Sequence, residues 1–405
     1  MKPRDITVVG CCPVCGVESG RVHEYKNRSV KHYQLGNMAI KEFPGIVFRC
    51  INKECDRKTF CVMTTDEGKA EVGGRGRYSR SSKQYIANRI LKYNSTYSSL
   101  HKEIRESFGG STSTASLYNW VQACNLLPAS EDNTVMQVLH TDEKHPSKKR
   151  SNTQYVIASC GRADKASKSV ALHANLSKSN DADAIEEHYK SLILNGLDPL
   201  KVLLVVTDMA SIYATAVAKY FPNALHQHCV FHLIQQINKY LKVSLRKHRQ
   251  EHLEEGNRKA AHQTSFLLLK GQEHLTSEEQ EEVAIFCEEH PTVDAEYNLK
   301  EDIRGLYATV TSLPQAIAYK DMIVERYTEI ISPEMTKALN CFVKNFEQSI
   351  AYIKTGFFLD KTNNDAERLM RNIKHTQQIH YFFRKSQNYI NSIRVAFGLV
   401  TPIAV

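Results

Sequence analysis

Hydrophobic residues recur with different periods along this chain, and each period predicts a different kind of region. Alternating apolar and polar residues predict short strands at 30–35 and 45–49. Spacings of three and four residues predict three helices between residues 85 and 124. Strand and helix patterns then alternate as far as residue 232, after which long helical patterns dominate. The chain is therefore expected to contain two small N-terminal regions, a mixed region and a long helical region.

The mixed region has the clearest strand pattern in the sequence. Its predicted elements are strands at 135–139, 155–160 and 169–173, a helix at 181–195, a strand at 202–206, a helix at 211–220 and a strand at 224–229. The first three strands are expected to form an antiparallel meander, with the first helix covering the sheet. The aliphatic run at 202–206 is typical of a strand buried on both faces.

Acidic residues stand where two of these strands end. Asp142 and Glu143 follow the first strand, and Asp208 follows the buried strand at 202–206. Ligands of open α/β sheets bind at the carboxyl ends of strands, so acids at these positions are candidates for a functional site. Neighbouring strand residues face opposite sides, so only one of Asp142 and Glu143 can point inward, and we favour Asp142.

A third acidic position opens a predicted helix at 362–374. Thr362, Asn363 and Asn364 are good N-cap residues, and Asp365 and Glu367 fall in the first turn, where carboxylates oppose the helix dipole. Two residues separate Asp365 from Glu367, which places them on different helix faces. Taken alone, this segment also fits a surface helix with exposed ion pairs.

Six of the eleven cysteines lie before residue 62. In a reducing compartment such clustering indicates a metal site rather than disulfides. The spacing predicts four thiolate ligands for one structural Zn²⁺ in a module that resembles a zinc ribbon: Cys12, Cys15, Cys50 and Cys55. Cys11 and Cys61 could replace one of these ligands, and a set of buried free cysteines is the alternative.

A basic, glycine-rich segment at 68–80 has the composition of a flexible linker. In the three predicted helices that follow, Gly109 and Gly110 break the chain before the third, which Ser113 or Thr114 can cap. This pattern is typical of a helix-turn-helix, and a small helical bundle is the alternative. The side chains that the third helix would offer to a DNA groove are Ser116, Asn119 and Gln122.

Composition limits the expected partners and cellular location of the protein but does not decide its function. The net charge of +9 over 405 residues suits a polyanionic partner but is also common without one. No apolar run approaches the roughly 18 residues of a membrane helix, and the first ten residues lack a signal-peptide pattern. We therefore expect no membrane association and a cytoplasmic location.

The order of strands and acids resembles the RNase H-like fold of DDE transposases and integrases, over residues 134–232 and 362–400. Residue by residue, Asp142 matches the first acid of that family, Asp208 the second, and Glu367 in the sequence NNDAERLMRNIK the third. Cys229 and His232 resemble the Cys-x2-His step of Mutator-like, hAT-like and several insertion-sequence transposases. A zinc ribbon followed by a helix-turn-helix is a further feature of insertion-sequence transposases.

The resemblance implies two Mg²⁺ (or Mn²⁺) ions in one active site. Two such ions stabilise the attacking and leaving oxygens when a phosphodiester is cleaved or transferred. By family analogy Asp142 would bridge the ions, Asp208 would bind one and Glu367 the other. Basic side chains would hold the DNA: Lys148, Lys149, Arg150, Arg368, Arg371 and Lys374. Cys229 and His232 are too few for a closed zinc site and are expected to pack beside the active site.

The expected fold class is α/β, with an RNase H-like mixed sheet interrupted by an all-helical insertion. The interval between Asp208 and Glu367 is longer than the fold requires, and helical patterns at 233–255, 276–290 and 333–355 fill it. The capping-box sequence that begins at Thr276 supports the second of these. The expected boundaries are 1–67 for the zinc ribbon, 68–80 for the linker, 81–130 for the helix-turn-helix, 233–360 for the insertion, and 134–232 with 361–405 for the core.

These features together predict a DDE transposase of an insertion sequence that binds the ends of its element and cleaves and transfers DNA strands. The family resemblance implies a homo-oligomer, expected to be a dimer, in a prokaryotic nucleoid. One alternative is a catalytically inactive or domesticated relative that only binds DNA. A second alternative is a nuclease of the same fold that cuts DNA without joining it.

Overall fold

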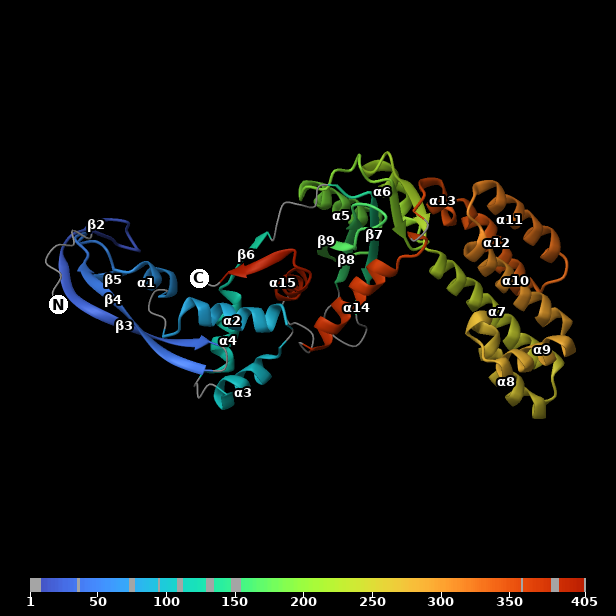
Figure 1. The fold of residues 1–405 in the computed structure, drawn as a ribbon, viewed down its shortest axis with the longest axis horizontal. Helices are drawn as coiled ribbons and strands as arrows, with labels where there is room; N and C mark the ends of the chain where they lie inside the picture. The colour runs from blue at the N-terminus through green and yellow to red at the C-terminus, as the bar shows by residue number, and fades with distance from the viewer. Residues whose placement is uncertain are drawn as a thin grey trace. The chain divides into compact units, whose positions relative to one another are not determined.

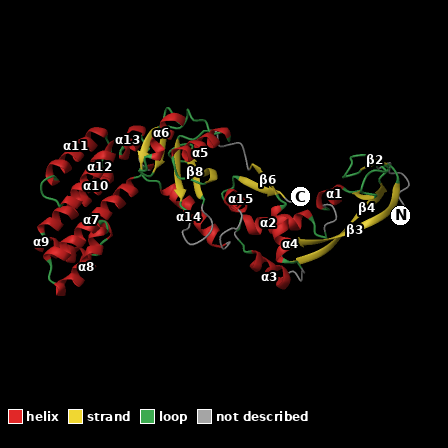
Figure 2. Ribbon diagram, turned by 180° about the vertical axis from the view of Figure 1, so that it is seen from behind, coloured by secondary structure: helices red, strands yellow, loops and turns green. Residues whose placement is uncertain are grey.

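The chain folds into two compact units, drawn in Figure 1 and, from behind, in Figure 2. One unit comprises Met1–Ala129 and Lys374–Val405, and the other comprises Ser130–Ile373. The computed structural model describes residues 9–34, 37–72, 77–93, 95–107, 112–128, 135–146, 154–357, 360–379 and 386–403. The fold is mixed α/β, as the sequence predicted.

The Ser130–Ile373 unit is built on a five-stranded sheet in the order β11-β10-β7-β8-β9. β7, β8 and β9 pair antiparallel, whereas β10 runs parallel to β7 and β11 parallel to β10. The elements in chain order are β7 (Val138–Lys144), β8 (Tyr155–Arg162), β9 (Val170–Ser177), α5 (Ala182–Leu194), β10 (Leu204–Thr207), α6 (Ile212–Tyr220) and β11 (Leu225–His228). The predicted order of strands and helices in this region is confirmed.

Apolar residues cover both faces of the sheet, which explains the unbroken aliphatic run of β10. Leu139 and Val205 pack in one cluster with Tyr189 of α5 and Tyr213 of α6. Val138, Leu204 and Val206 pack on the opposite side with helix α7 (Val230–His252). Because side chains alternate along a strand, His140 and Asp142 follow Val138 on this second side.

Between β11 and α14 the described residues form helices joined by loops, with no strand among them, as predicted. After α7 come α8 (Glu255–Leu269), the 3-10 helix η1 (Gln272–His274), α9 (Ser277–Glu289), α10 (Pro291–Thr309), α11 (Leu313–Tyr327), α12 (Pro333–Ser349) and α13 (Ala351–Thr355). The capping box is present, since Thr276 and Glu279 each bind the other's backbone N–H. None of the helices in the described ranges is long and apolar enough to cross a membrane.

The unit that contains the N-terminus has a three-stranded antiparallel sheet of β3 (Val22–Gln34), β4 (Asn37–Arg49) and β5 (Thr59–Met63). A second, two-stranded sheet pairs β1 (Gly10–Cys11) with β2 (Glu18–Ser19). The predicted short strands at 30–35 and 45–49 were wrong in length, because β3 and β4 each have 13 residues. Residues 22–27 of β3 are all exposed, so that half of the strand has no buried face and no apolar alternation to detect.

Three short helices in the same unit share one core. They are α2 (Arg80–Leu91), α3 (Tyr97–Ser107) and α4 (Thr114–Gln122). Ile86, Leu100 and Leu117, one from each helix, cluster with Tyr33 of β3. The Ser113 side chain accepts the backbone N–H of Ser116 at 3.1 Å and so caps α4, as predicted.

The C-terminal segment packs in this unit rather than on the five-stranded sheet. Val395 of α15 (Ser386–Ala396) belongs to the core of α2, α3 and α4, and β12 (Val400–Ile403) pairs with β6 (Asn125–Pro128). We had expected residues 361–405 to complete the core of the mixed region, and the structure instead divides the chain at Lys374. Tyr389, Ile390 and Ile393 recur at helical spacing in α15 and are buried, but periodicity does not say what covers a buried face.

The predicted linker at 68–80 is structured at both described ends. Gly68 lies within α1 (Asp66–Glu71), which Thr65 caps, and Tyr78 pairs with Lys31 of β3. A Cβ atom on Gly68 would meet Phe43 and Met63 at 3.2–3.3 Å, so this glycine serves close packing rather than flexibility. Composition alone cannot separate these two uses of glycine. Residues 73–76 lie outside the described ranges.

Candidate active site

Three elements bring the predicted acids to one edge of the five-stranded sheet. Asp142 lies near the end of β7 and Asp208 directly follows β10. Val206 pairs with His140 in the parallel β10–β7 register, so each aspartate follows its paired residue by two positions. Glu367 lies in the first turn of α14 (Asn364–Ile379).

The electrostatics of Asp142 show that the three acids interact. Burial raises the pKa of Asp142 to about 7, and the charge of Glu143 adds to this effect. Asp208 and Glu367 also raise the pKa of Asp142, whereas the N–H of Glu143, 2.9 Å from Asp142 Oδ1, lowers it. Like charges disfavour ionisation of a neighbouring carboxyl only at short range. The charges of Asp208 and Glu367 therefore both act on the partly buried carboxyl group of Asp142.

Glu143 is engaged on the opposite face of the sheet from Asp142. Its carboxylate accepts a hydrogen bond from the Tyr213 hydroxyl of α6 and another, at 2.9 Å, from Asn180 Nδ2. The alternation of side chains that favoured Asp142 over Glu143 is thus present in the structure.

Asp365, the alternative to Glu367, is engaged in ion pairs. Both Nη2 and Nε of Arg162 donate to Asp365 Oδ2, at 2.6 and 2.9 Å. Arg368 lies 3.8 Å from the other carboxylate oxygen. Glu367 points elsewhere, with Oε1 3.9 Å from Nδ1 of His232. The two-residue separation therefore gives the two acids different partners.

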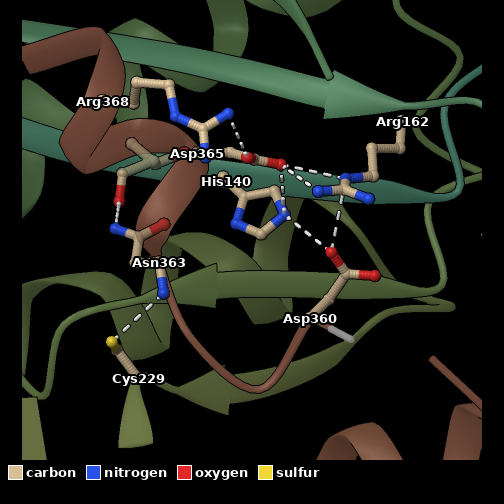
Figure 3. Close-up of polar contacts among 8 residues, drawn as sticks. His140, Arg162, Cys229, Asp360, Asn363, Asp365 and Arg368 are labelled. Atoms are coloured by element: carbon tan, nitrogen blue, oxygen red, sulfur yellow. Dashed lines mark hydrogen bonds and ion pairs between the residues drawn. The ribbon is translucent and has the colours of Figure 1, made fainter. Parts of the chain in front are cut away.

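A buried ion network holds the loop before α14 against the sheet (Figure 3). Its members are His140 of β7, Arg162 of β8, Asp360 and Asp365. His140 Nε2 lies 3.3 Å from Asp360 Oδ1, and Arg162 Nε lies 3.5 Å from the same oxygen. His140 and Asp360 are each 1% exposed, and Arg162 supplies the positive charge beside the buried Asp360.

Sequence reasoning missed this buried ion network. Arg162 and Asp365 are 203 positions apart, and nothing in the local pattern of either residue indicates the other. The one available signal was the charge of Arg162 at the end of an otherwise buried strand.

Asn363 is a second contact that joins α14 to β7 and α7 (Figure 3). Its side-chain Nδ2 donates to the Thr141 carbonyl of β7 at 2.9 Å, and its backbone N–H donates to Cys229 Sγ at 3.1 Å. The Asn363 carbonyl accepts the N–H of Glu367 at 2.9 Å. One residue thus ties the start of α14 to β7 and to the start of α7, which fixes the position of Glu367.

Cys229 and His232 lie beside Glu367. The three side chains each offer one ligand atom, and these atoms are all within 4.8 Å of one another. Burial raises the pKa of the Cys229 thiol to about 11, while the N–H groups of Asn363, His232 and Phe231 act in the opposite direction.

Comparison with known proteins identifies the family. The model of the ISL3-type DDE family, described as "Transposase", matches residues 139–393, which is more than half of the chain and includes Asp142, Asp208 and Glu367. The chain belongs to this transposase family. It is also similar to a solved structure, the Drosophila P element transposase strand transfer complex. That match has 11% identity and a TM-score of 0.46, and it covers 80% of this chain and 92% of the other. No curated protein matched.

The residues expected to contact DNA lie partly within and partly outside the described residues of the transposase. On α14, Arg368, Arg371 and Lys374 are exposed. On α4, Asn119 and Gln122 are exposed, whereas Ser116 is half-buried and contacts the Ser113 hydroxyl at 3.0 Å. The other predicted contacts lie outside the described residues: Lys148, Lys149 and Arg150.

Four cysteines of the transposase converge in the N-terminal unit, as their spacing predicted. Cys12 Sγ lies 3.8 Å from Cys55 Sγ, and Cys15 Sγ lies 3.7 Å from Cys50 Sγ. All four sulfur atoms are within 4.8 Å of one another, and we call this group the four-cysteine cluster. The N–H groups of Cys15 and Val14 lower the pKa of the Cys12 thiol to about 6, which favours the thiolate that binds metal.

The turn that forms the four-cysteine cluster depends on a glycine. Gly16 has a φ of 71°, a left-handed conformation that other residues rarely adopt. Of the two spare cysteines, Cys11 is exposed and donates to Glu18, and Cys61 lies on β5.

Proposed function

We propose that this transposase cleaves DNA at the ends of its mobile element and joins the freed ends to target DNA, using Asp142, Asp208 and Glu367. The observation that supports the proposal is that the parallel strands β7 and β10 carry Asp142 near the end of one and Asp208 just after the other, and that the charges of Asp208 and Glu367 both act on Asp142, within the region matched by the transposase family. The strand order β11-β10-β7-β8-β9 supports an RNase H-like core, because it has the central parallel pair and antiparallel meander of that fold.

The donor set fits hard divalent cations. Carboxylate oxygens are the ligands that Mg²⁺ prefers, and a cation would favour the ionised form of Asp142, whose pKa is raised by burial and by the neighbouring acids. When bound, two ions stabilise the attacking and leaving oxygens of an in-line displacement at phosphorus. Asp208 would bind one ion, Glu367 the other, and Asp142 both.

The reaction consists of two displacements at phosphorus. In cleavage, a water oxygen forms the new bond to phosphorus and the 3′ oxygen of the element's strand leaves. In strand transfer, that 3′ hydroxyl attacks a phosphorus of the target strand and displaces the target's own 3′ oxygen. The exposed Arg368, Arg371 and Lys374 would neutralise backbone phosphates beside this site.

The N-terminal unit is proposed to recognise the element's ends. Four closely spaced sulfur atoms, all from free cysteines, fit a structural Zn²⁺ in a zinc ribbon. Helices α3 and α4 would act as a helix-turn-helix, with the exposed Asn119 and Gln122 of α4 facing the DNA groove.

A cleavage and joining assay tests the proposal. The substrate is a DNA duplex that carries the element's terminal sequence, incubated with full-length protein, target DNA and Mg²⁺ or Mn²⁺. Asp142→Asn, Asp208→Asn and Glu367→Gln should each abolish cleavage while leaving DNA binding intact. Asp183→Asn, at an exposed position on α5, is the matched control and should remain active.

The same assay separates the alternative functions. Wild-type protein that binds the duplex but never cuts it would be an inactive DNA-binding relative. Cleaved product without joined product would indicate a nuclease. Full cleavage activity in Asp208→Asn would rule out the proposed active site.

A further inference from the structure

A mixed cluster of ligand types adjoins the proposed active site. Cys229 begins α7, His232 follows in its first turn, and Glu367 reaches them from α14. The separation between His232 Nδ1 and Glu367 Oε1 is 3.9 Å, and Cys229 Sγ lies within 4.8 Å of both partners' ligand atoms. A sulfur, an imidazole nitrogen and a carboxylate oxygen thus face one small volume.

Two of these ligand atoms are buried without being satisfied. Among the residues that the structure describes, His232 Nδ1 and Glu367 Oε1 make no hydrogen bond. Buried polar atoms are nearly always satisfied, so two unsatisfied atoms that face each other call for an explanation. A cation between them would satisfy both atoms at once.

One contact of Cys229 suits a metal-bound thiolate. The backbone N–H of Asn363 donates to Cys229 Sγ at 3.1 Å. Hydrogen bonds from outside the ligand set orient ligands and stabilise their charged form. Cys229 and His232 are three positions apart at the start of a helix, a spacing that places both side chains on one side of the first turn.

The cluster also has an entrance and an open coordination position. Cys229 is fully buried, but the side chains of His232 and Glu367 are 29% and 26% exposed, so an ion can approach from their side. Three protein ligands leave the fourth tetrahedral position of zinc to water, as in catalytic zinc sites. Thiolate and imidazole ligands select Zn²⁺ over Mg²⁺.

We propose that Cys229, His232 and Glu367 bind a thiophilic divalent cation, Zn²⁺ or a close chemical relative, at a site separate from the four-cysteine cluster. Glu367 takes part in both this site and the proposed Mg²⁺ site. Zinc at the mixed site therefore withdraws an acid from the Mg²⁺ site and inhibits strand cleavage. The inhibition rests on the proposed function, whereas the binding of zinc does not.

Cobalt spectroscopy tests the binding. Full-length protein is first supplied with one equivalent of Zn²⁺ to fill the four-cysteine cluster, and Co²⁺ is then titrated in. The wild type should develop the absorption band of a cobalt–thiolate bond, and Cys229→Ser should lose that band. His232→Ala should weaken Co²⁺ binding by about tenfold or more, since even the loss of a supporting residue costs that much.

Cys341→Ser is the matched control, because this half-buried cysteine of α12 belongs to none of the groups of close metal-ligand atoms found among the described residues. It should give the wild-type band. A wild type without the band, or a Cys229→Ser protein with the same band as the wild type, would overturn the mixed site.

A zinc titration of Mg²⁺-dependent cleavage tests the inhibition. The measured quantity is the zinc concentration that halves each protein's own cleavage rate. This concentration should rise by about tenfold or more in Cys229→Ser relative to Cys341→Ser. Equal zinc sensitivity in the two variants would overturn the shared role of Glu367. Absence of cleavage in every protein would instead count against the proposed function and leave the cobalt result to decide on the mixed site.

Discussion

The four-cysteine cluster and the acidic cluster are assembled in opposite ways. The cysteine ligands come as two local pairs, Cys12 with Cys15 and Cys50 with Cys55, each within one turn of chain. The acids come from β7, β10 and α14, and no two of them share an element. A local turn can hold its two ligands before the protein folds, whereas the acids meet only after the sheet and α14 have packed together.

This difference predicts what each site depends on. Among the residues that the structure describes, a small apolar cluster supports the four-cysteine cluster, with Ile46, Phe48 and Phe60 as its large members. A bound ion should therefore contribute much of the stability there. The acidic site has a full sheet beneath it, and the buried ion network and Asn363 position α14. Its geometry should persist without metal and fail when those contacts are removed.

Loss of the metal at the four-cysteine cluster is expected to have the largest effect. Cys12→Ser, or chelation of the wild type, should unfold the end of the β3–β4–β5 sheet near the cluster, because zinc binding to such modules is worth about 10–16 kcal/mol in zinc-finger peptides. Hydrogen exchange of the Phe48 and Phe60 amides measures this directly.

Cys11→Ser serves as the control for the cysteine substitution, since Cys11 is exposed. It should leave amide protection unchanged. Amide exchange in the five-stranded sheet should be the same in all three proteins. Full protection of the Phe48 amide after chelation would show that the apolar cluster alone stabilises this end of the sheet. The four-cysteine cluster would then not depend on a bound metal for its stability.

Breaking the buried ion network should have the next largest effect. Arg162→Met leaves Asp360 and Asp365 buried without their shared cation, which typically costs about 3–5 kcal/mol. Urea denaturation followed in the Ser130–Ile373 unit should show this loss. Arg371→Met, at an exposed position on α14, should change stability by less than about 0.5 kcal/mol. Equal stability of the two variants would mean that the network does not hold α14.

The acidic site should also produce a pH effect in the metal-free protein. The pKa of Asp142 is about 7 in the fold against its ordinary value of 3.8. The stabilising contribution of the protonated form is complete below pH 3.8 and is lost as the pH rises through about 7. Wild-type stability should therefore fall relative to Asp142→Asn over this range, by at most about 4 kcal/mol, since one pKa unit corresponds to about 1.4 kcal/mol.

Unfolding free energies of the two proteins, measured in chelator from pH 4 to pH 8, check this prediction. Mg²⁺ added at pH 8 should restore the wild type and leave Asp142→Asn unchanged. Parallel curves for the two proteins would show that neither burial nor the neighbouring acids raise the pKa of Asp142 in the fold.

Features that depend on local sequence could be predicted, whereas contacts between distant residues could not. Periodicity gave the order of strands in the mixed region, and the ends of two of those strands pointed to Asp142 and Asp208. The pairing of Arg162 with Asp365 could not be predicted, because neither residue's neighbours carry information about the other. The partner of α15 was missed for the same reason, since its apolar face fits any complementary surface.

The smallest predicted effect is the loss of stability when Asn363 is replaced, compared with replacement of the adjacent Asn364. Asn363 is fully buried and its side chain donates to the Thr141 carbonyl, whereas the adjacent Asn364 is exposed. Asn363→Ala leaves that carbonyl without its side-chain donor and should cost about 1–3 kcal/mol. Asn364→Ala should cost less than about 0.5 kcal/mol.

Stability alone would not show that Asn363 positions Glu367. Mn²⁺ affinity is therefore measured without denaturant, at a pH where both variants are folded. Asn363→Ala should bind Mn²⁺ more weakly than Asn364→Ala, because its α14 is no longer tied to β7 beside Asp142. Asn363→Asp tests the direction of the contact, since a carboxylate cannot donate to the Thr141 carbonyl and should also weaken Mn²⁺ binding. Equal Mn²⁺ affinity in all three variants would leave Asn363 a structural residue only, and the positioning of Glu367 would then rest on the Arg162–Asp365 pair.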